Sequence, residues 1–134
     1  MTVLFAMLLA AAQVSASSVA GRYQAVTETE YAIELQLSPS GQAQLEFRTW
    51  EADDPQHPTV RRFVGTWAWS GANVTIRFKS GRSATFAPVA CLSYKEFAQQ
   101  GCSPGLKLVT TTFPKQYGLQ RFGLWRSDAL RSQL

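Results

Sequence analysis

Residues 31–47 read YAIELQLSPSGQAQLEF, and this stretch decides how the rest of the chain is interpreted. Apolar side chains occupy every second position in 31–37 and again in 43–47, which is the period of a β-strand with one buried face. Between the two runs, Pro39 and Gly41 supply the restricted φ and the positive φ that a tight turn needs. The stretch therefore predicts a β-hairpin with an apolar face and a polar face.

The same alternation continues on both sides of this hairpin. Further strands are expected at 22–27, 60–70, 74–79, 84–88, 106–112 and 119–126. Tight turns join the earlier strands as sequential hairpins, and such a meander closes most economically as a barrel. We therefore expect an all-β fold, a small antiparallel meander barrel of lipocalin-like type with about eight strands and one short helix at 93–100.

The first 16 residues have the composition of a secretory signal peptide. No charged side chain occurs before Arg22, and the apolar core spans residues 3–12. This core is too short to cross a bilayer, which takes about 20 apolar residues, and Val14 and Ala16 provide small residues for cleavage after Ala16. We expect a periplasmic or secreted protein with a single domain over 17–134. A buried N-terminal helix is the alternative.

Two cysteines, Cys91 and Cys102, occur in the chain. In an exported protein an even number of cysteines indicates a disulfide. A metal or redox pair is the alternative, but the spacing differs from that of a CxxC motif, and two thiols with one histidine are few ligands for zinc. The sequence thus predicts a disulfide and no metal site. It also contains no cofactor-binding motif, so no cofactor is expected.

The chain carries 13 basic and 9 acidic residues, a net charge of +4. This balance favours contact with anionic surfaces, although solubility alone also explains it. Arg62, Arg77 and Lys79 are predicted to face outward on neighbouring strands, either as a basic patch or as a solvated edge. Nucleic acid is a poor partner for an exported protein. Strands of about seven residues with polar outward faces argue against a membrane-spanning barrel.

Groups suited to catalysis are few. His57 is the one histidine, so any Ser-His-Asp set would depend on it, and it lies in a polar loop from Glu51 to Pro58. The acids of this loop do not follow the EF-hand spacing. Glu34 and Glu46 are expected to face solvent across the hairpin as cross-strand partners, not as a catalytic pair. We predict no catalytic residue and no enzyme activity, with an enzyme that uses His57 as the alternative.

Aromatic residues are the remaining candidates for ligand binding. The four tryptophans are assigned this role: Trp50, Trp67, Trp69 and Trp125. Trp67 and Trp69 share the strand face of Phe63, which points inward in a barrel. An eight-stranded barrel is just wide enough to be filled by its own side chains. This face is therefore either a packed core or the lining of a cavity for a small apolar ligand.

Residues 21–23 (GRY), the hairpin 33–47 and above all 65–76 (GTWAWSGANVTI) resemble the small barrel domain of the bacterial NlpE-type envelope lipoproteins. The similarity extends over residues 21–86. It implies a lipocalin-like barrel in the cell envelope, and in that family the role is envelope-stress or copper sensing. The chain lacks the family's lipid-attachment cysteine and its CxxC pair. The resemblance therefore implies the fold and the compartment, but no membrane anchor and no thiol copper site.

The aromatic content and the scarcity of catalytic groups predict a non-catalytic exported binding module. Its ligand is expected to be a small hydrophobic molecule in the barrel mouth or an envelope protein at its loops. The alternative is an inhibitor of a secreted hydrolase, in which the loop from Glu51 to Pro58 or the disulfide-closed loop 91–102 enters the cleft of the enzyme.

Overall fold

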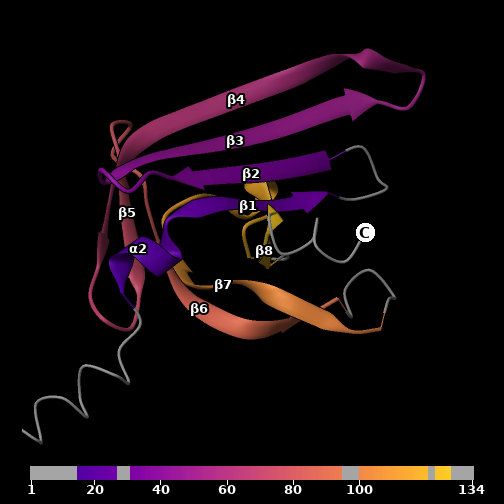
Figure 1. The fold of residues 1–134 in the computed structure, drawn as a ribbon. Coiled ribbons are helices and arrows are strands. Elements are labelled where there is room, and N and C mark those ends of the chain that lie inside the picture. The colour runs from indigo at the N-terminus through magenta and orange to yellow at the C-terminus, as the bar shows by residue number, and fades with distance from the viewer. Residues whose placement is uncertain (1–14, 27–30, 95–99, 121–122, 128–134) are drawn as a thin grey trace, which may run out of the picture.

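The computed structural model describes residues 15–26, 31–94, 100–120 and 123–127. Within them, each strand pairs antiparallel with the next, and β1 also pairs with β8, so the sheet closes into a barrel (Figure 1). The strands are β1 (Gly21–Val26), β2 (Tyr31–Leu37), β3 (Gln42–Glu51), β4 (Asp54–Trp69), β5 (Val74–Phe78), β6 (Ser83–Ser93), β7 (Cys102–Thr111) and β8 (Leu124–Arg126). A helical turn, α2 (Ala16–Val19), precedes β1, and a 3-10 turn (Lys115–Tyr117) follows β7. The predicted antiparallel meander barrel is confirmed.

The hairpin predicted from residues 31–47 is present. β2 and β3 pair from Tyr31 with Thr49 to Leu37 with Ala43, and Gly41 in the turn has a φ of 92°. The alternate residues of both strands are buried: Ile33, Leu35, Leu37, Ala43, Leu45 and Phe47. Full burial of a Leu, Ile or Phe side chain contributes about 1.5–3 kcal/mol, so this inner face stabilises the barrel strongly.

Side chains occupy the interior of the barrel. One aromatic cluster has ring centroids 4.9–6.3 Å apart and consists of Phe47, Phe63, Phe78, Phe113 and Tyr117. Phe113 and Tyr117 come from the segment after β7, which folds over the inner faces of β3 and β4. The mostly perpendicular ring contacts are those that aromatic pairs prefer. Because the strands and the segment after β7 both contribute rings, the cluster ties them together.

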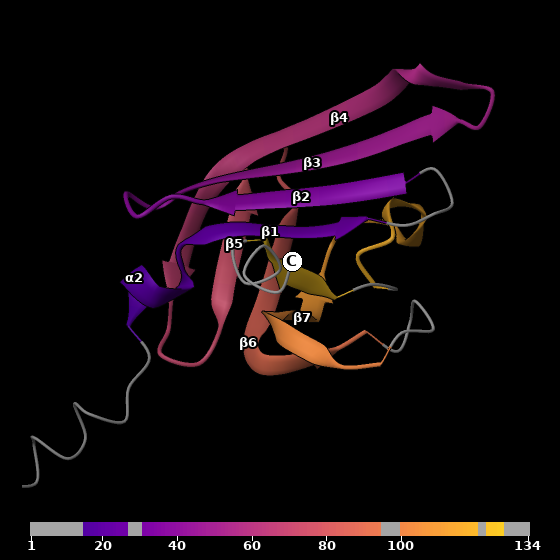
Figure 2. The same ribbon diagram turned by 45° about the vertical axis from the view of Figure 1, so that its right-hand side comes forward.

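The stretch from Glu51 to Pro58 differs from the predicted loop. Only residues 52 and 53 form a turn, and β4 already begins at Asp54. β3 and β4 therefore continue as a hairpin that projects beyond the barrel (Figures 1 and 2). In its first half β4 pairs, among the described strands, only with β3. Pro55 and Pro58 lie between the paired residues Asp54 and Thr59, where the register of β3 and β4 shifts. Proline is tolerated at such an irregularity of a one-sided strand, which explains why both fit within β4.

Further boundaries differ from the expected ones. The strand expected at 84–88 extends over Ser83–Ser93. The strand expected at 106–112 begins at Cys102, because β6 and β7 pair as far as Ser93 with Cys102. Cys91 and Cys102 form the predicted disulfide, with their Cα atoms 5.0 Å apart.

The strand expected at 119–126 is formed only by Leu124–Arg126, with residues 121–122 outside the description. The helix expected at 93–100 falls largely on residues 95–99, which also lie outside the described residues.

Residues just after the expected cleavage site belong to the barrel. Val19 is 2% exposed and packs in the core, and the Tyr23 hydroxyl donates a hydrogen bond to its carbonyl oxygen at 2.6 Å. Arg126 in β8 donates to the carbonyl oxygens of Ser18 and Ala20. The domain expected from residue 17 therefore starts with ordered contacts. Most of the expected signal peptide, residues 1–14, lies outside the described residues.

Gly65 allows β4 and β5 to approach closely. It pairs with Ala43 on one side and with Phe78 on the other. A Cβ atom at this position would collide with the carbonyl oxygen of Arg77 and would lie 2.7 Å from the Cα atom of Phe78. Figure 2 shows β4 bending along its length. Only glycine fits where the two backbones come this close.

Candidate functional site

A pocket of about 140 Å³ opens at one end of the barrel. We call it the mouth pocket, and its lining residues are Tyr31, Phe47, Thr49, Thr59, Arg61, Gln116 and Tyr117. Tyr31 pairs with Thr49, and Thr49 pairs with Thr59, across β2, β3 and β4. Because β2 begins at Tyr31, β3 and β4 continue past this point without it. The pocket therefore lies where the barrel wall ends and the projecting hairpin begins, and its surface is mostly apolar.

Arg61 carries the charge of the mouth pocket. It pairs with Phe47 across β3 and β4, and directly opposed residues of an antiparallel pair share one face of the sheet. Its guanidinium donates a hydrogen bond to the Tyr117 hydroxyl at 3.0 Å and lies 5.9 Å from the centroid of that ring. The side chain remains accessible to solvent. Arg61 thus places a positive charge on the inner face of the sheet, at the rim of an apolar pocket.

A second guanidinium reinforces this charge. Arg82 lies 5.5 Å from the centroid of the Tyr117 ring and 5.3 Å from that of Phe113. Among the described residues, neither Arg61 nor Arg82 forms an ion pair with a carboxylate. Two cations beside one ring, with no described acid paired to either, produce a positive potential that favours an anionic ligand.

Tyr31 and the 3-10 turn form another part of the wall. Burial raises the pKa of the Tyr31 phenol, so its side chain stays neutral even in alkaline solution and does not repel an anion. Gly118 ends the turn with a φ of 83°, and a Cβ atom there would lie 2.8 Å from the Tyr31 hydroxyl. Glycine at this position therefore lets the turn approach Tyr31 and hold Tyr117 over the pocket.

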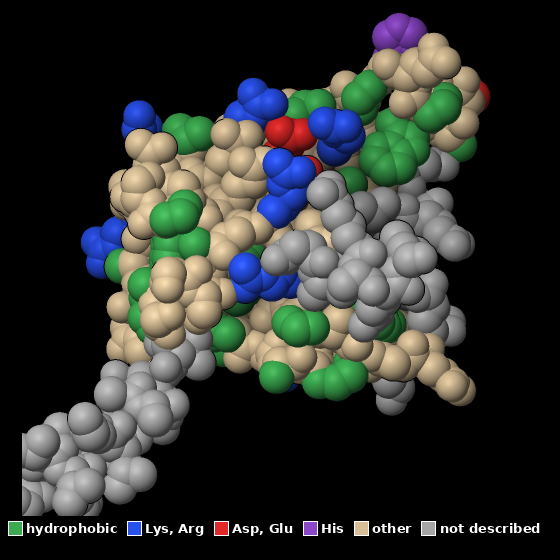
Figure 3. Space-filling view, viewed as in Figure 1, with side chains coloured by type: hydrophobic (Ala, Val, Ile, Leu, Met, Phe, Trp, Pro, Cys, Tyr) green, Lys and Arg blue, Asp and Glu red, His purple; other side chains and the backbone are tan. Residues whose placement is uncertain are grey.

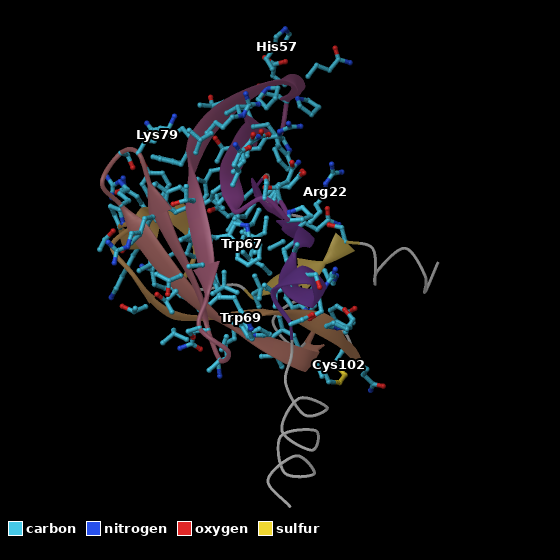
Figure 4. The ribbon with its side chains drawn as sticks, turned by 60° about the vertical axis from the view of Figure 1, so that its left-hand side comes forward. Arg22, His57, Trp67, Trp69, Lys79 and Cys102 are labelled. Atoms are coloured by element: carbon cyan, nitrogen blue, oxygen red, sulfur yellow. A yellow bond between two sulfur atoms is a disulfide. The ribbon has the colours of Figure 1, made fainter. Side chains whose placement is uncertain are left out.

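Trp67 and Trp69 lie further along β4 than the mouth pocket. Both are half-buried and pack against the core, and Figure 4 shows them on the barrel wall. The indole N–H of Trp67 donates to the carbonyl oxygen of Ser38 at 2.8 Å, which ties β4 to the turn after β2. In the described structure these two candidates are packed on the inner face, as expected, without lining the mouth pocket.

Trp125 and Trp50 lie elsewhere. Trp125 is buried in β8, stacks on Tyr94 with ring centroids 5.5 Å apart and donates to the carbonyl oxygen of Leu92 at 3.0 Å. Trp50 is half-buried at the base of the projecting hairpin. The structure therefore does not bring the four tryptophans together, and the rings that line the mouth pocket are those of Tyr31, Phe47 and Tyr117.

His57 lies at the tip of the projecting hairpin (Figure 4). Its Nδ1 atom is 2.6 Å from Oδ1 of Asp54, and the two side chains are 78% and 56% exposed. Within the described ranges, no three His, Cys, Asp or Glu side chains come close enough to hold a metal ion.

In the same ranges, no helix is long and apolar enough to cross a membrane.

Glu34 and Glu46 oppose each other on the outward face of β2 and β3, where the sequence predicted them. Arg22 lies 3.3 Å from Glu34. Arg48 and Arg62 lie 2.8 and 3.0 Å from Glu46. The hydrogen bond from Arg48, and to a smaller degree that from Arg62, lowers the pKa of the Glu46 carboxyl against the opposing effect of burial. These acids therefore serve as ion-pair partners of the outer surface.

Arg61 was not among the predicted site residues, although the alternation of β4 contains the signal. Residues 61, 63, 65, 67 and 69 have the same parity, so Arg61 shares the inward face assigned to Phe63 and Trp67. A charged residue in such a series indicates a barrel end or a site. Gln116 and Tyr117 follow a proline in a segment without periodicity, and no local pattern places them at the mouth.

Comparison of the chain with protein-family models, with curated proteins and with solved structures finds no match in any of the three. The resemblance to NlpE-type barrels accordingly stays a prediction.

Proposed function

We propose that the protein is a non-catalytic exported binding module whose mouth pocket takes a small organic anion with one ring-sized apolar body. The observation that carries this proposal is the inward-facing Arg61 at the rim of a mostly apolar pocket. The proposal keeps the predicted position of the ligand in the barrel mouth and its apolar body, and it adds a negative charge. The proposed binding residues are Phe47, Arg61 and Tyr117 instead of the four tryptophans.

The volume of the pocket determines the size of the ligand. A dry apolar cavity of about 150 Å³ holds one benzene molecule, whereas sites for drug-sized ligands measure roughly 300–1,000 Å³. The mouth pocket, at about 140 Å³, matches one ring or a short branched chain. A long acyl chain would leave most of its length in solvent. The pocket therefore favours a ligand smaller than a lipid.

The chemistry of the rim determines the charge of the ligand. A guanidinium has five N–H donors. Arg61 uses an N–H of its Nη1 atom to donate to the Tyr117 hydroxyl. The others remain available for a carboxylate, which arginine binds with two parallel hydrogen bonds. The half-buried ring of Tyr31 and the edge of Tyr117 line the pocket together with the buried Phe47, and they offer an aromatic body a ring contact. Benzoate is the simplest molecule that combines these features.

Several observations support a binding role in an exported protein. Among the described residues, the lining of the mouth pocket contains no carboxylate or imidazole to act as a general base, and His57 lies on the hairpin tip. The disulfide and the β fold are compatible with an oxidising, extracytoplasmic location. Val19 packs in the core, and Ser18 and Ala20 accept hydrogen bonds from Arg126, so cleavage after Ala16 would leave these contacts in place.

The test of the proposed function is titration with benzoate, measured by calorimetry. We expect saturable binding with a Kd on the order of 1 mM or below, as a nine-atom ligand allows. Arg61→Met should weaken benzoate binding roughly tenfold or more, because it removes a charge-assisted hydrogen bond. Benzyl alcohol, which has the ring without the charge, should bind weakly to both proteins.

Arg62→Met is the matched control, since it makes the same chemical change one residue further along β4. Arg62 faces outward and pairs with Glu46, so this variant should bind benzoate like the unchanged protein. Equal losses in the two variants, or equal binding of benzoate and benzyl alcohol, would show that Arg61 does not hold the ligand.

A second candidate function, inhibition of a secreted hydrolase, is favoured by the projecting hairpin. Its tip is held by the pairing of Glu51 with Asp54 and by the contact between Asp54 and His57. A preorganised tip loses less entropy when it enters a cleft than a loose loop does. The hairpin is therefore better suited to this role than the disulfide-closed segment, whose residues 95–99 lie outside the description.

Inhibition by the tip is testable with a panel of secreted peptidases and glycosidases. We expect the protein to inhibit at least one of them at micromolar concentration or below, and Asp54→Ala/His57→Ala to inhibit it at least tenfold less, since hot-spot losses commonly reach this size. The Arg61→Met protein, in which the tip is intact, should inhibit the same enzyme as strongly as the unchanged protein does. A panel in which no enzyme is inhibited would rule out this function for the classes tested.

A further inference from the structure

A second and larger hollow, of about 830 Å³, lies on the wall formed by β1 to β5. We call it the outer hollow. Its polar lining includes Arg22, Gln36, Gln42, Gln44, Arg77 and Lys79. None of its lining residues also lines the mouth pocket. An inference about it is therefore independent of the function proposed above.

The pairing of the strands gives the order of these side chains from β1 to β5. Gln36 is paired with Arg22 of β1 on one side and with Gln44 of β3 on the other. Gln42 is paired with Thr66, and Thr66 in turn with Arg77 of β5. The amides thus occupy the middle of the hollow and the cations its two flanks. Five adjacent strands about 4.8 Å apart extend over roughly 19 Å, which suits an extended ligand.

The cations at the two flanks differ in whether a carboxylate already neutralises them. Arg22 shares its charge with Glu34 at 3.3 Å. Within the described part of the chain, Arg77 and Lys79 have no carboxylate at ion-pair distance, and both are exposed. Figure 4 shows Arg22 and Lys79 on opposite sides of the view. Basic side chains also outnumber acidic ones on the barrel face in Figure 3. The flank formed by Arg77 and Lys79 is therefore free to bind an anion.

The apolar content of the hollow discriminates between classes of anionic partner. Protein interfaces depend on aromatic or aliphatic anchors at their centre, and grooves for single-stranded nucleic acid depend on aromatic platforms. The aromatic residue of the lining is Phe78, which is 5% exposed, and the exposed large apolar residue is Val64. Neither provides such a platform or a cluster of anchors.

Side-chain amides match a ligand that is rich in hydroxyl groups. Each glutamine amide both donates and accepts hydrogen bonds, as a hydroxyl does. Gln36 already donates to Glu34 at 3.0 Å, whereas Gln42 and Gln44 line the hollow from β3, the middle one of its five strands. A row of amides between two cationic flanks complements a chain that carries hydroxyls together with carboxylates.

We propose that the outer hollow binds an extended acidic polysaccharide. Its carboxylates pair with Arg77 and Lys79 at one flank, and its hydroxyls hydrogen-bond to Gln42 and Gln44 in the middle. The binding is non-covalent, and its strength falls as the salt concentration rises, because exposed charges are screened.

The test compares three probes on the full protein: hexagalacturonate, the neutral maltohexaose and the acidic peptide hexaglutamate. Hexagalacturonate should bind roughly tenfold more tightly than either of the others. Arg77→Gln/Lys79→Gln should reduce its affinity roughly tenfold. Lys107→Gln/Lys115→Gln changes the net charge equally at exposed residues outside the hollow, and should change the affinity less than about twofold.

Gln42→Ala/Gln44→Ala separates a polysaccharide from an acidic peptide. This variant should lose affinity for hexagalacturonate and keep its weak affinity for hexaglutamate. Hexaglutamate binding as tightly as hexagalacturonate would replace the proposed ligand with a protein partner. Equal losses in the two charge variants, or no binding of hexagalacturonate at about 1 mM, would overturn the site. Benzoate binding by Arg77→Gln/Lys79→Gln, which should be unchanged, confirms that this variant folds and keeps the two sites distinguishable.

Discussion

Gly65→Ala is expected to lower the free energy of unfolding by about 3 kcal/mol, at the upper end for an overpacked site, or to prevent folding. The added Cβ would overlap the carbonyl oxygen of Arg77 and lie 2.7 Å from the Cα atom of Phe78. Both atoms belong to the backbone of β5, so no side-chain rotation relieves the collision. Only a separation of β4 from β5 does so. Urea unfolding followed by tryptophan fluorescence measures the effect.

Thr66→Ala is the control for this variant. Thr66 is the next residue of β4 and is exposed, so its replacement should change the stability by no more than about 0.5 kcal/mol. If Gly65→Ala were as stable as Thr66→Ala, the close approach of β4 and β5 described above would be wrong.

Cys91→Ser/Cys102→Ser is expected to lower the free energy of unfolding by about 3 kcal/mol. The disulfide joins residues separated by 11 positions, at the ends of the paired strands β6 and β7. Its loss increases the conformational freedom of the unfolded chain more than that of the folded barrel. Denaturant unfolding with and without a reductant measures this contribution.

The reductant also provides the control. The unchanged protein should lose about 3 kcal/mol when it is reduced, to the level of the double variant, and the double variant should not respond to reductant. A protein whose unfolding midpoint is the same under both conditions would contradict a stabilising disulfide.

The part of the fold that could be predicted is the part in which local patterns and tertiary structure agree. Residues 31–47 show the period of a half-buried strand and carry a turn with Gly41 at positive φ, so register and faces follow from the sequence. The start of β4 could not be predicted. Pro55 and Pro58 indicate a loop by themselves. They fit within β4 because the register with β3 shifts between Asp54 and Thr59 and no second described strand pairs there, and both are tertiary facts.

Closure into a barrel is predicted by the meander and confirmed, but the bounds of the strand that closes it are a long-range property. β8 contains Leu124–Arg126 and pairs with β1 through Tyr23 with Arg126 and Gln24 with Trp125. Three residues are too few for a recognisable alternation. Their strand conformation is imposed by the neighbouring strands β1 and β7, and by the hydrogen bonds of Arg126 to the segment before β1.

The candidate site could be predicted in part. The strand parity that placed Trp67 and Trp69 on the inner face also places Arg61 there, and this residue defines the rim of the mouth pocket. The sequence does not reveal which inner-face residues pack and which remain accessible. Trp67 packs because its indole N–H reaches the carbonyl of Ser38, and Tyr117 covers the pocket because a segment distant in sequence folds over β3 and β4.

The inward guanidinium of Arg61 is tested most directly by nuclear magnetic resonance of the ¹⁵N-labelled protein during a benzoate titration. We predict that the side-chain Nε–H signal of Arg61 and the backbone signals of Thr49, Thr59 and Tyr117 shift together with one Kd, while the Nε–H signal of Arg62 stays in place. Equal shifts of the two arginine signals, or shifts confined to residues outside the mouth pocket, would contradict binding at the barrel mouth.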